Sequence, residues 1–228
     1  MPGVSQALFV ARMLDRGLVQ GRRVLDVGAC DFNGSVRPLL EEWGAKEYIG
    51  IDIIAGPRVD IVCSADKLVN TFGEESFDVV LCIEMLEHAE DWRACVCNLK
   101  QVLKTDGLLI LTTRSFGYPC HGFPHDYWRY ELEDLRHIFR DLEIQVLESD
   151  YANPGVFLKG RKPENFRAKD LNEIELYSVL SNRREREIDQ HIRSHAYYRR
   201  LALKQRVRLL AGNGFLAAGR LISRLLNV

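Results

Sequence analysis

The sequence predicts an α/β fold: a Rossmann-like, seven-stranded, mostly parallel sheet with helices on both faces, followed by a helical C-terminal extension. Short apolar runs that suit buried strands alternate with segments of helical spacing along the first 140 residues. Such alternation is typical of a parallel sheet covered by helices. The first apolar run ends in Asp26, a turn containing glycine follows, and a helical pattern begins after it, which is the strand–turn–helix order of that fold.

The individual elements follow from this pattern in chain order. A leading helix is expected over about 4–18, where charged residues such as Arg12 interrupt the apolar pattern and exclude a signal peptide. Strands are expected near 22–27, 47–51, 59–63, 77–83 and 107–113, and helices near 34–43, 65–71, 91–104 and 131–140. Two further strands, near 142–148 and 155–159, are expected to close the sheet as an antiparallel pair.

The pattern changes after about residue 162, so we expect a domain over 1–162 and a basic helical extension over 163–228. Apolar residues within 171–180 have helical spacing, an arginine-rich run continues to Arg208, and 215–226 is amphipathic. Helical spacing of this kind predicts helices that bury one side and leave the other in solvent.

Composition limits the class of protein. The chain has 228 residues, of which 46% are hydrophobic, enough for one domain with a sizeable core and an extension. Its six cysteines include no CxxC pair, so the thiols are interpreted as reduced, as is typical of a cytoplasmic protein. No apolar run reaches the roughly 18 residues that span a bilayer, and no recognisable metal-ligand pattern is present, so the sequence predicts no metal site.

Charge divides the chain into two parts. Residues 1–180 carry 20 Lys and Arg against 29 Asp and Glu, whereas residues 181–228 carry 11 against 3. Three interpretations of this basic tail stay open: a solvated helical face, peripheral contact with an anionic membrane surface, and contact with an anionic substrate. Nucleic acid is not an expected partner, because the body is acidic and no nucleic-acid-binding motif is present. The oligomeric state is left open.

The turn after the first strand indicates a bound cofactor. Gly28 and Gly34 carry no side chain and allow a ligand to approach the backbone closely. The second apolar run ends in Asp52, about two dozen residues later, and an acid at the tip of the second strand suits the hydroxyl groups of a ribose. Together these features predict a cofactor that contains a nucleoside.

Two classes of cofactor share this layout. A dinucleotide site uses Gly-x-Gly-x-x-Gly, which places the pyrophosphate on a helix N-terminus. Here the spacing runs from Gly28 to Gly34, with Cys30 and Asp31 between them. That loop is longer, and Asp31 would repel phosphate while suiting a cofactor with a cationic amino-acid end. An NAD-type oxidoreductase is therefore the weaker alternative.

Five motifs in order make the chain resemble a class I S-adenosylmethionine-dependent methyltransferase of the type 11 branch. Asp26-x-Gly28 resembles the first motif, with Cys30 where a glycine is usual, and Asp52 resembles the ribose-binding acid. Residues 64–66, 77–88 and 103–111 resemble the adenine-contacting segment, the fourth-strand motif, and the turn with the fifth strand. The resemblance runs from about Val24 to Phe139 and implies S-adenosylmethionine as the cofactor.

The resemblance also implies which residues bind that cofactor. They lie at the ends of the first four strands and in the loops that follow them. The set is Asp26, Gly28, Ala29, Cys30, Gly34, Asp52, Ile53, Ala65, Asp66, Ile83 and Glu84. Glu84 has an alternative interpretation as the cap of the next helix.

The loop 114–130 is expected to cover the acceptor, because it follows the fifth strand. His125 and His121 are the candidate general bases, with Asp126 orienting one of them, because histidine exchanges protons near neutral pH. The alternative is a structural lid whose polar side chains bond only to one another. The segment 125–130 resembles members that modify sugars and natural products, which implies O-methylation of a sugar, glycan or other small acceptor. A non-catalytic cofactor-binding scaffold of a membrane-associated biosynthetic complex is the remaining alternative.

Overall fold

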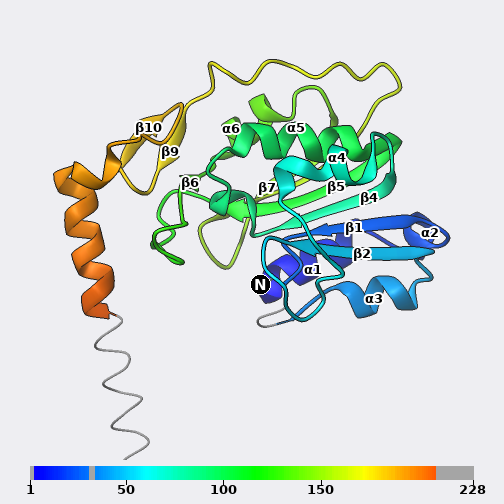
Figure 1. The fold of residues 1–228 in the computed structure, drawn as a ribbon. Coiled ribbons are helices and arrows are strands. Elements are labelled where there is room, and N and C mark those ends of the chain that lie inside the picture. The colour runs from blue at the N-terminus through cyan, green and yellow to red at the C-terminus, as the bar shows by residue number, and fades with distance from the viewer. Residues whose placement is uncertain (1–2, 31–33, 209–228) are drawn as a thin grey trace, which may run out of the picture.

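The computed structural model describes residues 3–30 and 34–208. Its main sheet has seven strands in the order β3-β2-β1-β4-β5-β8-β7 (Figure 1). These strands are β1 (Arg23–Val27), β2 (Glu47–Asp52), β3 (Ile61–Val62), β4 (Phe77–Ile83), β5 (Leu103–Arg114), β7 (Glu143–Ser149) and β8 (Gly155–Arg161). The first five run parallel, and β8 is antiparallel to both β5 and β7. This order confirms the predicted Rossmann-like sheet and its antiparallel closing pair.

Helices cover both faces of the main sheet. The α-helices are α1 (Val4–Met13), α2 (Arg16–Val19), α3 (Arg37–Glu42), α4 (Leu68–Phe72), α5 (Trp92–Val102) and α6 (Leu132–Ile138), and the short 3-10 helices are η1 (Ala65–Lys67), η2 (Leu86–His88) and η3 (Ile192–Ser194). Figure 1 shows α1 and α3 on one face and α4, α5 and α6 on the other. The prediction of one helix over 4–18 is wrong at Leu14, which is extended, because the Asp15 side chain accepts a hydrogen bond from the Leu18 amide and begins a new helix.

The alternation of side chains along each strand builds a core on each face of the sheet. On β4, Val80 and Cys82 pack beneath the helices α4, α5 and α6, whereas Val79, Leu81 and Ile83 pack toward α1 and α3. Strand β4 is therefore apolar on both sides, which is why it appears in the sequence as a nearly continuous apolar run.

A second, three-stranded sheet joins the C-terminal part to the loop that follows β5. It consists of β6 (Trp128–Arg129), β9 (Leu176–Ser178) and β10 (Arg183–Glu185), in the order β10-β9-β6. The helix predicted from the spacing within 171–180 is therefore wrong. The backbone there pairs with Trp128 and Arg129, and Leu176 and Ser178 are buried while Tyr177 is half-buried, so tertiary pairing outweighs the local helical period.

Arg93 on α5 holds the crossing segment that leads to this small sheet. Its guanidinium donates to the carbonyl oxygens of Leu171 at 2.9 Å, Ile174 at 2.6 Å and Arg186 at 2.5 Å. Because the Arg93 guanidinium donates hydrogen bonds to several backbone carbonyl oxygens of this segment, it fixes the segment against α5.

Residues 196–208 form a helix, as the predicted helical C-terminal extension requires. Tyr198 and Leu201 pack against the core from one side of it, while Arg199 and Arg200 are exposed. The amphipathic segment 215–226 lies outside the described residues. None of the helices within the described ranges is both long enough and apolar enough to cross a membrane.

Candidate active site

The turn after β1 depends on Gly28. Its φ is +84°, a left-handed conformation that favours glycine, and a Cβ placed there would lie 2.8 Å from Cβ and Cγ of Met85. The amides of Gly28 and Ala29 both donate to the carbonyl oxygen of Ile51 at 2.9 Å. The turn is therefore bonded to β2 on one side and packed against the residue that follows Glu84 on the other.

Asp52 lies where the carboxyl end of β2 meets this turn. Its Oδ2 accepts a hydrogen bond from the Cys30 amide at 3.2 Å, and its Oδ1 accepts one from the Ile54 amide at 3.2 Å. The side chain is half-buried, and a carboxylate has about four lone-pair sites. Both oxygens thus keep acceptor capacity for two ribose hydroxyl groups, and the residue fits the predicted role.

Asp26, at the end of β1, has a different environment. It is only 7% exposed, and its Oδ2 accepts a hydrogen bond from the Tyr48 hydroxyl at 2.7 Å. Burial raises the pKa of Asp26 to about 6, against the opposing effect of the Tyr48 hydrogen bond. A cationic group near Asp26 would favour its ionised form, which suits a cofactor with an ammonium group.

The other predicted cofactor residues lie around the same edge of the sheet. Gly34 has open space at its Cβ position, and the Ile53 side chain is 71% exposed. Asp66 accepts a hydrogen bond from the Ser64 hydroxyl, which lowers the pKa of its carboxyl group. Ala65 and Ile83 are buried in the core and offer this edge chiefly their backbone. Cys30 is buried beside Asp52, and Asp31 lies outside the described residues. An open glycine turn and an acid with spare acceptors fit S-adenosylmethionine.

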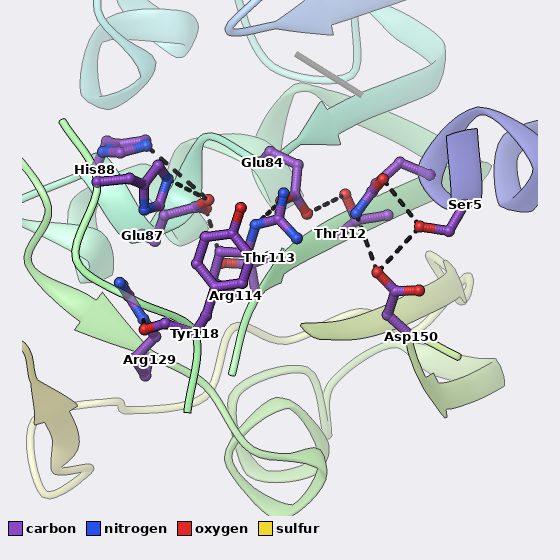
Figure 2. Close-up of polar contacts among 12 residues, drawn as sticks. Ser5, Glu84, Glu87, His88, Thr112, Thr113, Arg114, Tyr118, Arg129 and Asp150 are labelled. Carbon is purple, nitrogen blue, oxygen red and sulfur yellow. Dashed lines mark hydrogen bonds and ion pairs between the residues drawn. The ribbon is translucent and has the colours of Figure 1, made fainter. Parts of the chain in front are cut away.

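Glu84 is engaged within the protein. Its Oε1 accepts a hydrogen bond from the Thr112 hydroxyl at 3.0 Å, and its Oε2 pairs with the Arg114 guanidinium. Arg114 in turn lies 3.9 Å above the centre of the Tyr118 ring (Figure 2). Burial, followed by the charge of Glu87, raises the pKa of Glu84. Glu84 does not cap η2, and its contact with the cofactor stays a prediction.

Glu87 is a site residue that the sequence analysis missed. Its side chain is fully buried, and its Oε2 accepts a hydrogen bond from the Thr113 hydroxyl at 2.9 Å. Its Oε1 has no hydrogen-bond partner among the described residues. Nε2 of His121 lies 3.8 Å from that oxygen, and Nε2 of His88 lies 4.0 Å from it. Figure 2 shows His88 directed toward the Glu87 carboxylate. In the sequence, the adjacent residues Glu87 and His88 shortly after the fourth strand were the pattern that could have indicated this site.

Asp126 lies against both the backbone and the ring of His121. Asp126 Oδ2 accepts a hydrogen bond from the backbone amide of His121 at 2.7 Å. The same oxygen lies 3.1 Å from Nδ1 of the His121 ring. Both carboxylate oxygens also accept from the Arg129 guanidinium, at 2.6 and 2.8 Å. Although burial opposes its ionisation, the bonds from Arg129 and His121 hold the pKa of Asp126 well below its usual range. Asp126 is therefore an anion at neutral pH.

His125 lies apart from this arrangement. Its ring is exposed, and Nδ1 lies 3.0 Å from the Tyr127 hydroxyl. Its backbone oxygen lies 2.6 Å from Nδ1 of His88. The structure therefore brings His121, and not His125, to the Asp126 carboxylate.

A cavity of about 240 Å³ opens between the loop after β5, strand β9 and the helix over 196–208. Aromatic rings of Phe116, Tyr118 and Tyr177 line it, together with the cations of Lys204 and Arg208. Flat rings with a few placed charges are typical of a small-molecule site.

Comparison with known proteins identifies the chemistry associated with this fold. A family model described as a methyltransferase domain matches residues 6–208. Ubiquinone biosynthesis O-methyltransferase of Idiomarina loihiensis is 33% identical over 106 residues, which cover 41% of this chain and 42% of that protein. The protein of the same name from Bordetella avium is 27% identical over 185 residues, 73% of each chain. The chain thus spans about two fifths of the first of these relatives.

Solved structures share the fold. A Burkholderia thailandensis 1,6-didemethyltoxoflavin-N1-methyltransferase, bound to its acceptor and S-adenosylhomocysteine, superposes with a TM-score of 0.55 at 18% identity, covering 70% of this chain and 77% of that one. An S-adenosylmethionine-dependent methyltransferase from Mesorhizobium loti gives 0.54 at 18% identity, covering 70% and 99%.

Proposed function

The chain belongs to the class I S-adenosylmethionine-dependent methyltransferases, and on that premise we propose that it methylates a hydroxyl oxygen of a small ring-containing acceptor, a sugar or related natural product. When bound, S-adenosylmethionine supplies the methyl group. The chain's own residues have to hold that cofactor, align the acceptor, and remove the acceptor's proton.

The aromatic cavity is the observation that carries this proposal. The Phe116 ring packs edge-on against Tyr177 with 4.7 Å between their centres, and Phe116 belongs to the same loop after β5 as His121. Sugar and aromatic rings both pack on such surfaces. The cations of Lys204 and Arg208 at the same cavity favour an acceptor with an anionic substituent.

Oxygen as the methylated atom has support from the curated relatives, which are named O-methyltransferases. A hydroxyl group has a high pKa and reacts faster when a base removes its proton. In this chain His121 suits that role better than His125, because Asp126 lies 3.1 Å from its Nδ1 and leaves Nε2 directed inward, 3.8 Å from Glu87.

An acceptor panel with labelled S-adenosylmethionine tests the proposal, with S-adenosylhomocysteine formation as the readout. We expect turnover on hydroxylated rings that carry a phosphate or carboxylate. Phe116→Ala should raise the KM for the acceptor about fivefold to tenfold, the equivalent of one lost aromatic contact, without changing cofactor affinity. Tyr151→Ala is the matched control, since Tyr151 is 76% exposed and does not line the cavity.

A second candidate acceptor is a compound related to ubiquinone, which the names of the curated relatives favour. The panel therefore includes hydroxylated quinone precursors beside sugars. If only the quinone precursors are methylated, the acceptor belongs to this second class. Tight cofactor binding without S-adenosylhomocysteine formation on any acceptor would instead favour the non-catalytic scaffold.

The outer face of the helix over 196–208 supports a further part of the proposal, peripheral contact with an anionic membrane. Arg199 and Arg200 are exposed there, and so are the apolar side chains of Leu203 and Val207, at 64% and 57%. Cosedimentation with vesicles that contain an anionic lipid should fall when Arg199 and Arg200 are changed to Glu. Equal sedimentation of the unaltered chain and the variant would favour the other interpretation of the basic helix, a face exposed to solvent.

A further inference from the structure

We propose that Glu87, His88 and His121 form a binding site for one divalent transition-metal ion, with Zn²⁺ the ion that this ligand set fits best. Two imidazole nitrogens and one carboxylate oxygen are the ligands of many catalytic zinc sites, which keep a fourth position open. One ligand atom of each of the three residues lies within 4.8 Å of the others.

His88 is held in the form that binds a metal. Its Nδ1 lies 2.6 Å from the backbone oxygen of His125. A carbonyl oxygen only accepts hydrogen bonds, so Nδ1 carries the proton. Nε2 of the neutral ring then bears a lone pair, and it lies 4.0 Å from Glu87 Oε1.

His121 lies beside a different acceptor, a carboxylate. Its Nδ1 lies 3.1 Å from Asp126 Oδ2, and Asp126 is kept anionic by Arg129. A carboxylate beside Nδ1 favours a proton on that atom and leaves the lone pair on Nε2. This lone pair lies 3.8 Å from Glu87 Oε1. Metal-binding histidines commonly donate their second ring nitrogen to a carbonyl or a carboxylate. The His88 ring makes such a hydrogen bond, and the His121 ring has a carboxylate oxygen 3.1 Å away.

Glu87 provides a second observation that favours a cation at this site. Its side chain is fully buried, yet Oε1 lacks a hydrogen-bond partner within the part of the chain that the structure describes. An unpaired oxygen on a buried carboxylate carries a large desolvation cost. A cation between Oε1 and the two Nε2 atoms would offset that cost, while the Thr113 hydroxyl orients the other oxygen.

The separations require only small movements. Zinc–nitrogen and zinc–oxygen bonds of about 2.0–2.1 Å place tetrahedral ligand atoms about 3.4 Å apart. The measured separations of 3.8 and 4.0 Å from Glu87 Oε1 are within about half an ångström of that value.

The site has a consequence for the proposed methyl transfer. A hydroxyl group bound at the open position of a zinc ion has a lowered pKa. With an ion bound, Nε2 of His121 would be a ligand and not the base. The ion would lower the pKa of the acceptor hydroxyl, whose proton would pass to solvent. This consequence rests on the proposed function, whereas binding of the ion does not, so the two can fail separately.

Calorimetric titration of Zn²⁺ into the chelator-treated full chain tests the site. We expect one saturable equivalent, and Co²⁺ in its place should give the visible absorption of a four- or five-coordinate ion. His121→Ala and Glu87→Gln should each weaken binding by well over tenfold, since loss of an outer-shell partner alone costs about 10–100-fold. Glu87→Gln keeps the size of the side chain and removes only its charge, so it guards against a folding defect.

His137→Ala is the matched control, because His137 is exposed on α6 and is not one of the three grouped residues. It should bind Zn²⁺ as the unaltered chain does. The proposal is overturned if the folded chain binds no equivalent of Zn²⁺, or if binding persists in both folded variants, His121→Ala and Glu87→Gln. Metal binding without turnover on any acceptor would leave the site standing and count only against the proposed methyl transfer.

Discussion

The Cys30 amide donates a hydrogen bond to Asp52 Oδ2 across 3.2 Å, which ties the turn after β1 to the acid that ends β2. The Cys63 amide in turn donates to the Asp52 carbonyl oxygen at 2.9 Å. One residue thus connects the cofactor turn with the second and third strands. Its carboxylate is preorganised by backbone donors before any ligand arrives, and preorganised acceptors lose little entropy on binding.

Asp52→Ala should lower the affinity for S-adenosylmethionine by at least about 100-fold. Two hydrogen bonds from ribose hydroxyls to a charged acceptor are each worth about 1.5–3 kcal/mol. Calorimetric titration measures this loss. Glu47→Ala is the control, because Glu47 begins the same strand, at the opposite edge of the sheet. Affinity unchanged in Asp52→Ala would remove the ribose assignment.

Gly28→Ala should destabilise the fold more than Gly21→Ala. Both glycines have a left-handed φ, +84° and +72°, so each substitution costs about 1–2 kcal/mol for the backbone alone. At Gly28 the new Cβ also meets Met85 at 2.8 Å, whereas at Gly21 nothing lies within 4 Å. Overpacking adds about 1–3 kcal/mol. Urea unfolding of the two variants isolates that difference, and equal losses would show that Met85 moves away freely.

Asp26→Asn should raise the free energy of unfolding at pH 7.5, and the increase should be smaller at lower pH. The folded pKa of about 6 exceeds the unfolded value of 3.8, so between these values the folded state holds a proton that the unfolded chain has lost. Stability therefore falls as pH rises from about 4 to 6. The full cost, about 3 kcal/mol at 1.36 kcal/mol per pKa unit, is present above that range.

Urea unfolding at pH 4.5 and 7.5 measures this effect, and the gain should shrink to about a third at the lower pH. Asp78→Asn is a control of opposite sign. Despite partial burial, hydrogen bonds from the Arg23 amide and Lys104 lower the pKa of Asp78. Its contribution is present at neutral pH and lost on acidification, so that variant should be less stable at pH 7.5. A gain from Asp26→Asn that does not change with pH would contradict the burial argument.

The main sheet could be predicted from the sequence because its signals are local. An apolar run of strand length and an Asp-Gly turn at its end are properties of neighbouring residues, and the strands lie close to their predicted positions. The segment over 171–180 failed for the converse reason. Its conformation depends on Trp128 and Arg129, which lie about fifty residues earlier and supply the pairing strand.

The sequence predicted a site residue correctly in position only where the residue type and its place at a strand end together indicate a role. Asp52 stands at a strand end, and its exposure and partners follow from that position. The pairing of Asp126 with Arg129 and His121, and the approach of His121 to Glu87, arise from the path of the loop after β5. The spacing of residues along the chain does not predict the conformation of this loop. The sequence alone therefore could not show which of His125 and His121 lies beside Asp126.

His121→Ala should lower kcat by about 10²–10⁴-fold, the usual contribution of a positioned proton acceptor, and cofactor affinity should not change. The reason holds whether Nε2 of His121 takes the proton itself or binds the proposed ion, because Asp126 directs that atom inward in both cases. His125→Ala should lower kcat less than about tenfold, since its exposed ring contacts the hydroxyl and the ring of Tyr127 and lies away from Asp126. Steady-state kinetics on a turned-over acceptor, with Tm values to confirm folding, measure both variants. A large loss in His125→Ala beside a small one in His121→Ala would assign the base to His125 and reduce the contact between His121 and Asp126 to a structural one.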